Sequence, residues 1–376
     1  MIFVQFAVFN FSPFIVSIVS ELSLTYTQVG LVQTALFIPY TIAQVLVGPV
    51  VDKYPSKNML VLAAATFVAC SIMFALSTQL SQLLLLQAVK GIAMAFIFVI
   101  SVRQVLANSR GTSGGSMSFY SSSFAMGPLL VGFVTAAFTG LNESWRTIVL
   151  AMNLTGLLPL LLLFTVSPVT ALPISTQSMR HNVTSVLARR ESWVLGYDQF
   201  LRFGVVTSFS TWIPTFLVQS HSFSPLDASL LLGAGWTTAL IFIVLGGLLA
   251  GRTGNSFLVI ELAILCLAPA ALLVGGVSNY VALWGTILCF SALMNFHFAP
   301  LFSILPDIFG SDKIGLVTGI EGAMASTGAF TLPAIFGFVR DTSGSFSYGW
   351  YVVALLATIG AFSSVTLRSY RHRNSA

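Results

Sequence analysis

The protein has 376 residues, of which 56% are hydrophobic and 7% are charged, and its mean hydropathy is +0.93. A soluble domain usually carries about 25% charged residues, so this composition excludes a water-soluble globular fold. The net charge of +5 comes from basic residues spread over short loops, which indicates membrane topology and requires no nucleic-acid partner.

Apolar runs long enough to cross about 30 Å of hydrocarbon as helices recur along the chain. The strands of a lipid-embedded barrel would alternate in polarity, and runs such as LLLLQAVKGIAMAFIFVI do not. A signal peptide is the alternative for the first run, which lacks a basic leading segment and a small-residue cleavage site. The sequence therefore predicts an all-α membrane protein with twelve transmembrane helices, at 2–20, 27–50, 58–77, 80–102, 113–139, 146–166, 193–219, 227–250, 256–276, 279–303, 314–338 and 348–367.

Basic residues sort to one side of these helices. With the N-terminus inside, twelve of them fall in or beside cytoplasmic segments, and Arg146 and Arg340 fall outside. This bias predicts a protein of the cell (inner or plasma) membrane with both termini in the cytoplasm. The longest polar interruption, 168–191, predicts a cytoplasmic linker between two six-helix bundles, 1–167 and 192–376, the second ending in a short basic tail.

The two halves repeat at an offset near 200 residues. GPVVDKYPSK at 48–57 faces GLLAGRTGNS at 247–256, and Gly127-Pro128 faces Leu332-Pro333. Two homologous halves in parallel repeat are typical of membrane transporters, whose substrate site lies near the bilayer midplane at the repeat interface.

These stretches resemble the major facilitator superfamily. GPVVDKYPSK resembles its signature between the second and third helices, and SFAMGPLLVG resembles its fifth-helix signature. The resemblance implies two pseudo-symmetric six-helix bundles and transport by alternating access. Pro128 removes a backbone hydrogen bond in mid-helix, which predicts a kink at Gly127 and Pro128. The start of the eleventh helix, with its partial positive charge, lies on the same side as Asp52, so we expect a gating motif in which Asp52 docks there or on a nearby cation. The residues of that motif are Gly48, Asp52, Lys53, Lys57 and Arg252.

Two further stretches resemble the anion-handling members of this superfamily. They are STWIPTFL at 210–217 and LPAIFGFVRDTSGSF at 332–346. The resemblance implies a secondary active transporter that moves a small organic anion or metabolite, coupled to protons, as a monomer without cofactors. Two alternatives remain open: a proton-antiport exporter of drugs or metabolites, which Gly127-Pro128 favours, and a transporter-like sensor without flux.

An enzyme is not expected. The sequence has no ATP-binding loop, no Ser/His/Asp set at one depth and no cluster of His, Asp or Cys at metal spacing. The cysteines Cys70, Cys266 and Cys289 sit singly in apolar runs and are interpreted as small core residues.

Charged residues inside helices are the best site candidates, because each is costly in the bilayer unless it is paired or hydrated. We expect Arg202 to bind substrate or to pair with Glu321. Glu321 or His297 is expected to carry the coupling proton, since both side-chain types bind and release protons. Lys90 either adds positive charge to the central cavity or extends toward the outer headgroups.

Polar and aromatic residues on the helices expected to face the cavity complete the candidate substrate site. They are Asn10, Gln33, Tyr40, Tyr120, Trp212, Trp236 and Asn295.

Overall fold

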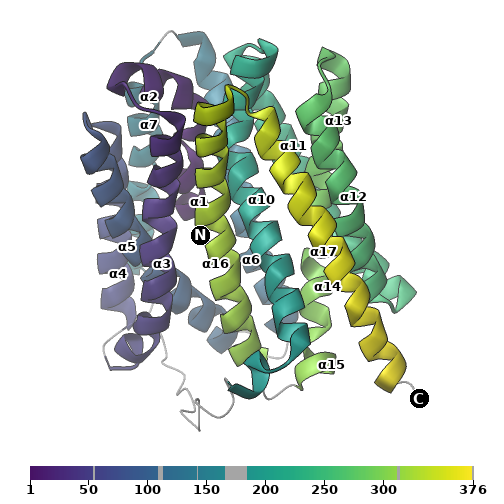
Figure 1. The fold of residues 1–376 in the computed structure, drawn as a ribbon. Helices are drawn as coiled ribbons and strands as arrows, with labels where there is room; N and C mark the ends of the chain where they lie inside the picture. The colour runs from purple at the N-terminus through teal and green to yellow at the C-terminus, as the bar shows by residue number, and fades with distance from the viewer. Residues whose placement is uncertain (54–55, 109–112, 142, 166–183, 311–313, 375–376) are drawn as a thin grey trace. The chain divides into compact units, whose positions relative to one another are not determined.

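The computed structural model of the protein describes residues 1–53, 56–108, 113–141, 143–165, 184–310 and 314–374. Within these ranges every regular element is a helix (Figure 1). The earlier helices are α1 (Ile2–Phe9), η1 (Ser12–Phe14), α2 (Ile15–Leu22), α3 (Tyr26–Lys53), α4 (Ser56–Ala75), α5 (Leu80–Asn108), α6 (Ser113–Phe138), η2 (Thr139–Leu141), α7 (Trp145–Leu154) and α8 (Leu157–Thr165). The later ones are α10 (Arg190–His221), α11 (Pro225–Thr253), α12 (Ser256–Gly276), α13 (Tyr280–Met294), α14 (Phe298–Ser303), α15 (Leu305–Phe309), α16 (Ile314–Ser343) and α17 (Ser347–Asn374).

Each of the twelve predicted spans falls on one of these helices or on two or three helices in succession. Among the described residues, nine helical segments are long and apolar enough to cross a membrane, with mean hydropathies between 1.2 and 2.6. Ser122–Phe138 and Ser347–Ser363 are shorter apolar helices. The prediction of an all-helical membrane protein is therefore confirmed.

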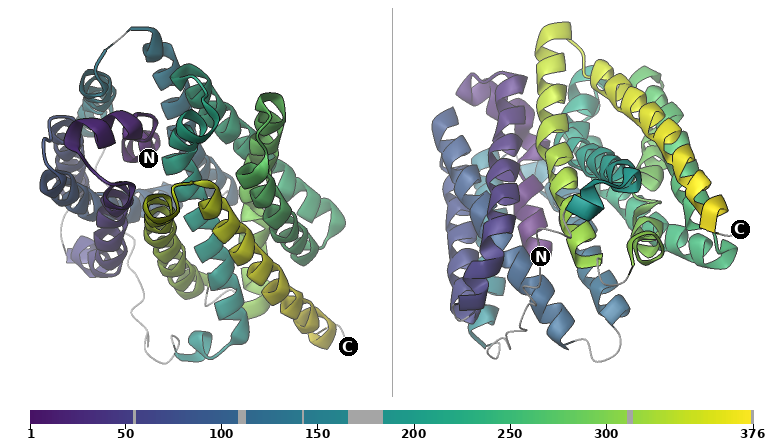
Figure 2. Two further views of the ribbon diagram at one scale, coloured as in Figure 1. Left: turned by 45° about the horizontal axis from the view of Figure 1, so that its top comes forward. Right: turned by 60° about the horizontal axis from the view of Figure 1, so that its bottom comes forward.

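The chain divides into two compact units. Unit 1 contains Met1–Ser175 and Ser210–Gly233, and unit 2 contains Thr176–Phe209 and Ala234–Ala376. In unit 1, α5 packs along both α3 and α4, and α1 packs on α6 (Figure 1). In unit 2, α17 packs along α12. It also follows α16 after a short turn, and α16 and α17 are adjacent in both views of Figure 2. The predicted linker lies mostly outside the described residues, so the predicted bundle boundaries stay predictions.

Three predicted spans are interrupted instead of continuous. The breaks fall at Asn10–Phe11 in the first span, Thr155–Gly156 in the sixth and Asn295–His297 in the tenth. A proline stands shortly after each break: Pro13, Pro159 and Pro300. A proline lacks an N–H, and its ring clashes with the carbonyl four residues earlier, which here belongs to Phe9, Thr155 and Phe296. Pro13 and Pro300 therefore deprive the Phe9 and Phe296 carbonyls of the N–H that a continuous helix would supply.

Several helices begin at a side-chain cap. The Asn255 side chain accepts a bond from the backbone N–H of Leu258, and the Asn279 side chain accepts one from Ala282, at 3.2 and 3.0 Å. Asparagine is among the best residues at this position because it satisfies an N–H that the first helical turn leaves unpaired. The polar residues between apolar runs therefore fix where α12 and α13 start.

Arg146 joins the ends of three helices in unit 1. Its Nε donates to Glu21 at the end of α2, at 2.8 Å. Its Nη1 donates to the carbonyl oxygens of Ala75 and Ser77 at 2.8 and 2.6 Å. The Trp145 indole donates to the second Glu21 oxygen at 2.5 Å. Because the last carbonyls of a helix lack internal donors, this cation satisfies the end of α4 and ties it to α2 and α7.

Candidate functional site

Buried polar side chains gather in unit 2 on three segments: α10, the turn between α13 and α14, and α16. Five of them are at most 3% exposed, and Arg202 is half-buried. The members of this polar cluster are Asp198, Gln199, Arg202, Asn295, His297 and Glu321. Four of them were expected from the sequence, and the structure brings these four together; Asp198 and Gln199 were not expected.

Arg202 is the central cation of the polar cluster. Its Nε donates to Gln199 Oε1 at 3.0 Å, and its Nη1 donates to Asn295 Oδ1 at 3.2 Å. The guanidinium carbon lies 4.3 Å from the ring centroid of Phe298, a stacking geometry typical of arginine. A guanidinium has five N–H donors, so most of them have no partner within the described part of the chain. Arg202 is held in place by neutral groups and keeps donors available for an anion.

The break in the tenth span supplies two members of the polar cluster. Asn295 and His297 lie in the turn that joins α13 to α14. The Nδ1 atom of His297 and the amide nitrogen of Asn295 are buried without a hydrogen-bond partner among the described residues. Non-helical backbone inside a membrane protein is tolerated where it is buried in protein or lines a cavity, and broken helices commonly form the binding sites of transporters.

Two carboxylates of the polar cluster have no bonded partner. Asp198 is 0% exposed and Glu321 is 1% exposed. None of their four carboxylate oxygens has a hydrogen-bond partner among the described residues. The Gln199 side chain is a neutral polar neighbour of the Glu321 carboxylate, and Arg202 interacts with that carboxylate electrostatically. The expected pairing of Arg202 with Glu321 is not present as a direct contact, because the guanidinium bonds to Gln199 and Asn295 instead.

Close helix contacts hold the polar cluster together. A Cβ atom built on Gly328 of α16 would overlap the carbonyl oxygen of Phe200 and would lie 3.1 Å from the backbone nitrogen of Gly204. A Cβ on Gly246 of α11 would overlap the carbonyl oxygen of Phe296, in the broken turn. Glycine permits such approaches because it has no side chain. In lipid, apolar burial does not drive helices together, so close packing of this kind has to stabilise their contact.

Lys90 lies inside unit 1 and is 2% exposed. Its Nζ donates to the carbonyl oxygen of Ala7 at 3.1 Å and lies 5.3 and 5.5 Å from the ring centroids of Phe67 and Phe74 on α4. Ala7 is in the last turn of α1, where the break leaves carbonyls free and the helix dipole favours a cation. Lys90 therefore supports the broken first span, and its burial excludes the alternative in which it extends toward headgroups.

Asn10 is bonded within unit 1. Its amide donates to Asn153 Oδ1 at 2.7 Å, and the Asn153 amide donates to the carbonyl oxygen of Ser71 at 2.7 Å. This chain of buried bonds links the break in the first span to α7 and α4.

We expect Asn153→Leu, which keeps the volume of the side chain, to lower the free energy of unfolding by about 1–3 kcal/mol, since it leaves the Asn10 amide buried without its acceptor. Thermal unfolding in detergent, followed by tryptophan fluorescence, measures the change. Thr155→Val is the matched control, because the Thr155 hydroxyl donates to the Met152 carbonyl within its own turn; equal effects of the two substitutions would contradict the interpretation.

None of the remaining substrate-site candidates is a member of the polar cluster, and all but Trp236 belong to unit 1. Tyr40 and Tyr120 each lie 6.4 Å from the ring of Phe98, on α3, α6 and α5 of unit 1. Gln33 donates to Thr211 at 3.1 Å. Two tryptophans were also expected to face the cavity; both are buried, Trp212 beside Tyr26 with ring centroids 6.2 Å apart, and Trp236 on α11.

The gating and kink residues are only partly described. The side chains of Asp52 and Lys53, and the surroundings of Gly48, lie outside the described part of the chain, while Lys57 donates to the carbonyl oxygen of Phe164 at 3.2 Å. Arg252 is exposed near the end of α11. Gly127 and Pro128 lie within a continuous α6, and a Cβ on Gly127 would overlap Gln5 of α1. Close packing of α1 on α6 thus explains this glycine, and the kink remains a prediction.

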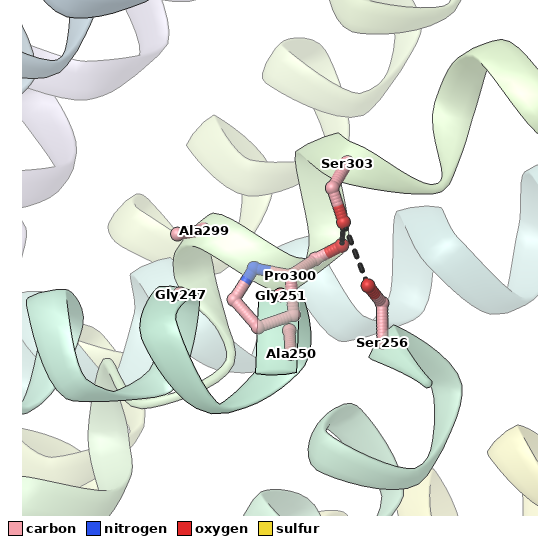
Figure 3. A pocket seen from close by; sticks show the side chains of 7 residues that line it. All are labelled: Gly247, Ala250, Gly251, Ser256, Ala299, Pro300 and Ser303. Atoms are coloured by element: carbon pink, nitrogen blue, oxygen red, sulfur yellow. Dashed lines mark hydrogen bonds between the residues drawn. The ribbon is translucent and has the colours of Figure 1, made fainter. Parts of the chain in front are cut away.

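A cavity of ≈ 290 Å³ opens beside the second copy of the signature stretch, at the ends of α11, α12 and α14 (Figure 3). The hydroxyls of Ser256 and Ser303 meet there at 2.9 Å. The other lining residues are Gly247, Ala250, Gly251, Ala299 and Pro300. No charged residue is among these seven, so the cavity does not match an anion site, and the polar cluster remains the better candidate.

The chain resembles known transporters over nearly its whole length. A family model described as "Major Facilitator Superfamily" matches residues 1–333. The "Probable sulfoacetate transporter SauU" of Cupriavidus necator is 26% identical over 92% of this chain and 86% of the relative. The "Hexuronate transporter" of Bacillus subtilis is 23% identical over 92% of this chain and 86% of the relative. Among solved structures, a D-xylose-proton symporter matches with a TM-score of 0.82 and 15% identity, over 96% of this chain and 94% of the other chain. This match supports the fold and carries no information about the substrate.

Proposed function

The chain belongs to the major facilitator superfamily, and from this premise we propose that it moves a small organic anion across the membrane by alternating access, with Arg202 as the anion-binding group. Membership confirms the predicted fold class and makes the protein a multi-pass secondary transporter rather than an enzyme. The substrate, the coupling ion and the orientation with both termini in the cytoplasm are parts of the proposal.

The observation that carries the proposal is the guanidinium of Arg202. It is oriented by two neutral amides and one aromatic ring, and it keeps N–H donors without partners in the described part of unit 2. A planar guanidinium matches carboxylate and sulfonate oxygens well, because two parallel N–H groups can bond to them at once. Sulfoacetate and hexuronate, the substrates in the names of two relatives, carry such groups.

Two titratable members of the polar cluster, Glu321 and His297, are suited to proton coupling. Glu321 and His297 are both buried and interact electrostatically with Arg202. Binding of an anion to Arg202 changes the charge that both groups face, so their affinity for a proton depends on substrate. The proposal is therefore an anion and proton moving in the same direction.

The alternative of a proton-antiport exporter had its support in Gly127-Pro128. The overlap that a Cβ on Gly127 would make with Gln5 gives this glycine a packing role that any function could require. The exporter therefore remains the second candidate and is separated from the first by experiment.

Uptake by proteoliposomes tests the proposal. We expect the purified protein to accumulate sulfoacetate or glucuronate when the outside is made more acidic, and to leave the hydrophobic cation tetraphenylphosphonium unmoved. Movement of the cation against an imposed pH gradient, with no anion uptake, would favour the exporter. Binding of the anions without accumulation under any gradient would favour the sensor.

A further inference from the structure

Asp198 is a buried acid for which the anion-binding role of Arg202 gives no explanation by itself. We propose that Asp198 and Glu321 form a pair that carries the coupling proton jointly, so that either acid can hold it. This inference rests on the proposed function, because it takes Arg202 as the anion-binding group. It adds Asp198, which the sequence did not suggest, and replaces a single proton carrier by two.

The geometry places the two acids on facing stretches of α10 and α16. A Cβ on Gly196, two residues before Asp198, would overlap the sulfur of Met324, and the carbonyl of Phe200 contacts Gly328. Glu321 lies one turn before Met324 on α16. The two carboxylates are close enough to interact electrostatically, and both are fully buried.

The charged and titratable groups around the pair come from several helices. Arg202 lies one turn after Asp198 on α10, and Tyr197 precedes it with its hydroxyl bonded to the carbonyl of Leu356 on α17 at 2.8 Å. His297 approaches from the turn after α13 and interacts electrostatically with Arg202. The part of α17 that packs on Tyr197, residues 352–363, contains no ionisable side chain. Among the described residues, the charged and titratable neighbours of the pair are therefore Arg202, His297 and Tyr197.

Charge balance shows why the pair holds a proton at rest. A buried carboxylate without a bonded partner costs several kcal/mol, and two like charges close together in a low-dielectric interior cannot both ionise easily. Arg202 offsets one negative charge, so the cluster is neutral when one carboxylate is ionised and the other is protonated. Two interacting acids of this kind titrate as a unit rather than as separate groups.

Anion binding then changes the balance by one charge. A monoanion on Arg202 neutralises the guanidinium and leaves the ionised carboxylate without its cation. That carboxylate takes up a proton from hydronium on the same side of the membrane: the carboxyl O–H bond forms as one O–H bond of hydronium breaks, and water is left. Release of the anion restores the charge on Arg202, and the proton leaves. One proton thus travels with each monoanion, and net charge movement is zero.

The test uses the full-length protein in proteoliposomes with glucuronate as the monoanion. Proton entry is followed with an internal pH dye, and anion exchange at equal pH is followed with labelled glucuronate. Asp198→Asn and Glu321→Gln are each expected to retain glucuronate-driven proton entry, because the remaining acid carries the proton. The double variant is expected to retain exchange and to lose proton entry.

Other outcomes would contradict the inference that Asp198 and Glu321 share the coupling proton. Loss of proton entry in one single variant with exchange intact identifies a lone carrier, and proton entry in the double variant assigns the proton to His297 or to another group. If the double variant fails to fold, infrared difference spectra of the single variants replace it: a protonated-carboxyl band induced by glucuronate is expected in both, and a band in only one contradicts the inference. If the wild type accumulates neither sulfoacetate nor glucuronate, the proposed function itself fails.

Discussion

Replacing Arg202 by glutamine is expected to reduce glucuronate uptake to near background. Removing one partner of a buried charged contact costs about 2–5 kcal/mol, which corresponds to a loss of roughly 30-fold to several thousand-fold in apparent affinity. Glutamine keeps a neutral donor near Asn295 but supplies neither the charge nor the paired N–H groups. Initial rates of uptake by proteoliposomes, normalised to the amount of reconstituted protein, measure the effect.

Two variants control this experiment. Arg202→Lys keeps the charge and loses the planar pair of donors, so we expect intermediate uptake. Arg190→Gln removes an exposed arginine from the first turn of the same helix, and its uptake should match the wild type. If Arg202→Gln transports as well as Arg190→Gln does, Arg202 is not the anion-binding group.

The second large effect is expected at Gly328, where Gly328→Ala should strongly destabilise unit 2. The added methyl group would overlap the carbonyl oxygen of Phe200, and a backbone atom of a packed helix cannot move aside as a flexible side chain can. Overpacking usually costs about 1–3 kcal/mol, and here α10 and α16 have to separate. We expect a clearly lower unfolding temperature in detergent, with transport lost because Asp198 and Glu321 sit on the separated helices.

Gly322→Ala is the matched control on the same helix. A Cβ on Gly322 meets no described atom within 4 Å, and alanine is favoured over glycine in a helix interior by up to about 1 kcal/mol. This variant should be as stable as the wild type or slightly more stable. Equal destabilisation by Gly322→Ala and Gly328→Ala would mean that helix contact at Gly328 is not the cause.

The helices could be predicted from the sequence because each apolar run has to hide its own backbone in lipid. The breaks were not predicted, because prolines occur both at the breaks and within helices that continue. Three residues before each proline at a break stands Asn10, Gly156 or His297, while Leu36, Ala125, Thr211, Cys266 and Phe330 hold that position before prolines in helices that continue. Helix propensity separates only Gly156 from this second set, because Asn and His rank with Thr, Cys and Phe, so the sequence does not indicate which prolines interrupt a helix.

The polar cluster was predicted in part. Arg202, His297 and Glu321 stand out because a charged or titratable side chain within an apolar run requires a reason. Asp198 does not stand out in the same way, because it lies near the start of the predicted span 193–219. What decides its role is the contact between α10 and α16 at Gly196 and Gly328, and the sequence does not reveal which two glycines meet a neighbouring helix.

The glycines of the eleventh span also show that spacing alone does not identify which glycine makes a close helix contact. Gly319 and Gly322 suggest a packing surface from their spacing, yet a Cβ on either would meet no described atom within 4 Å. Gly328, two turns further on, makes the close contact. Asn10 and Lys90 likewise looked like substrate ligands, whereas their hydrogen bonds to Asn153 and Ala7 are internal to unit 1.

The interruption at Asn295–His297 also provides a hinge in the tenth span. Bending a continuous helix requires at least one hydrogen bond between successive turns to open, which is costly in a medium without water. At this point Pro300 has already removed the donor for the Phe296 carbonyl, and Gly246 presents no side chain to that carbonyl from α11. The residues after the break can therefore swing relative to those before it by rotating a few backbone dihedrals, with every bond of α13 kept.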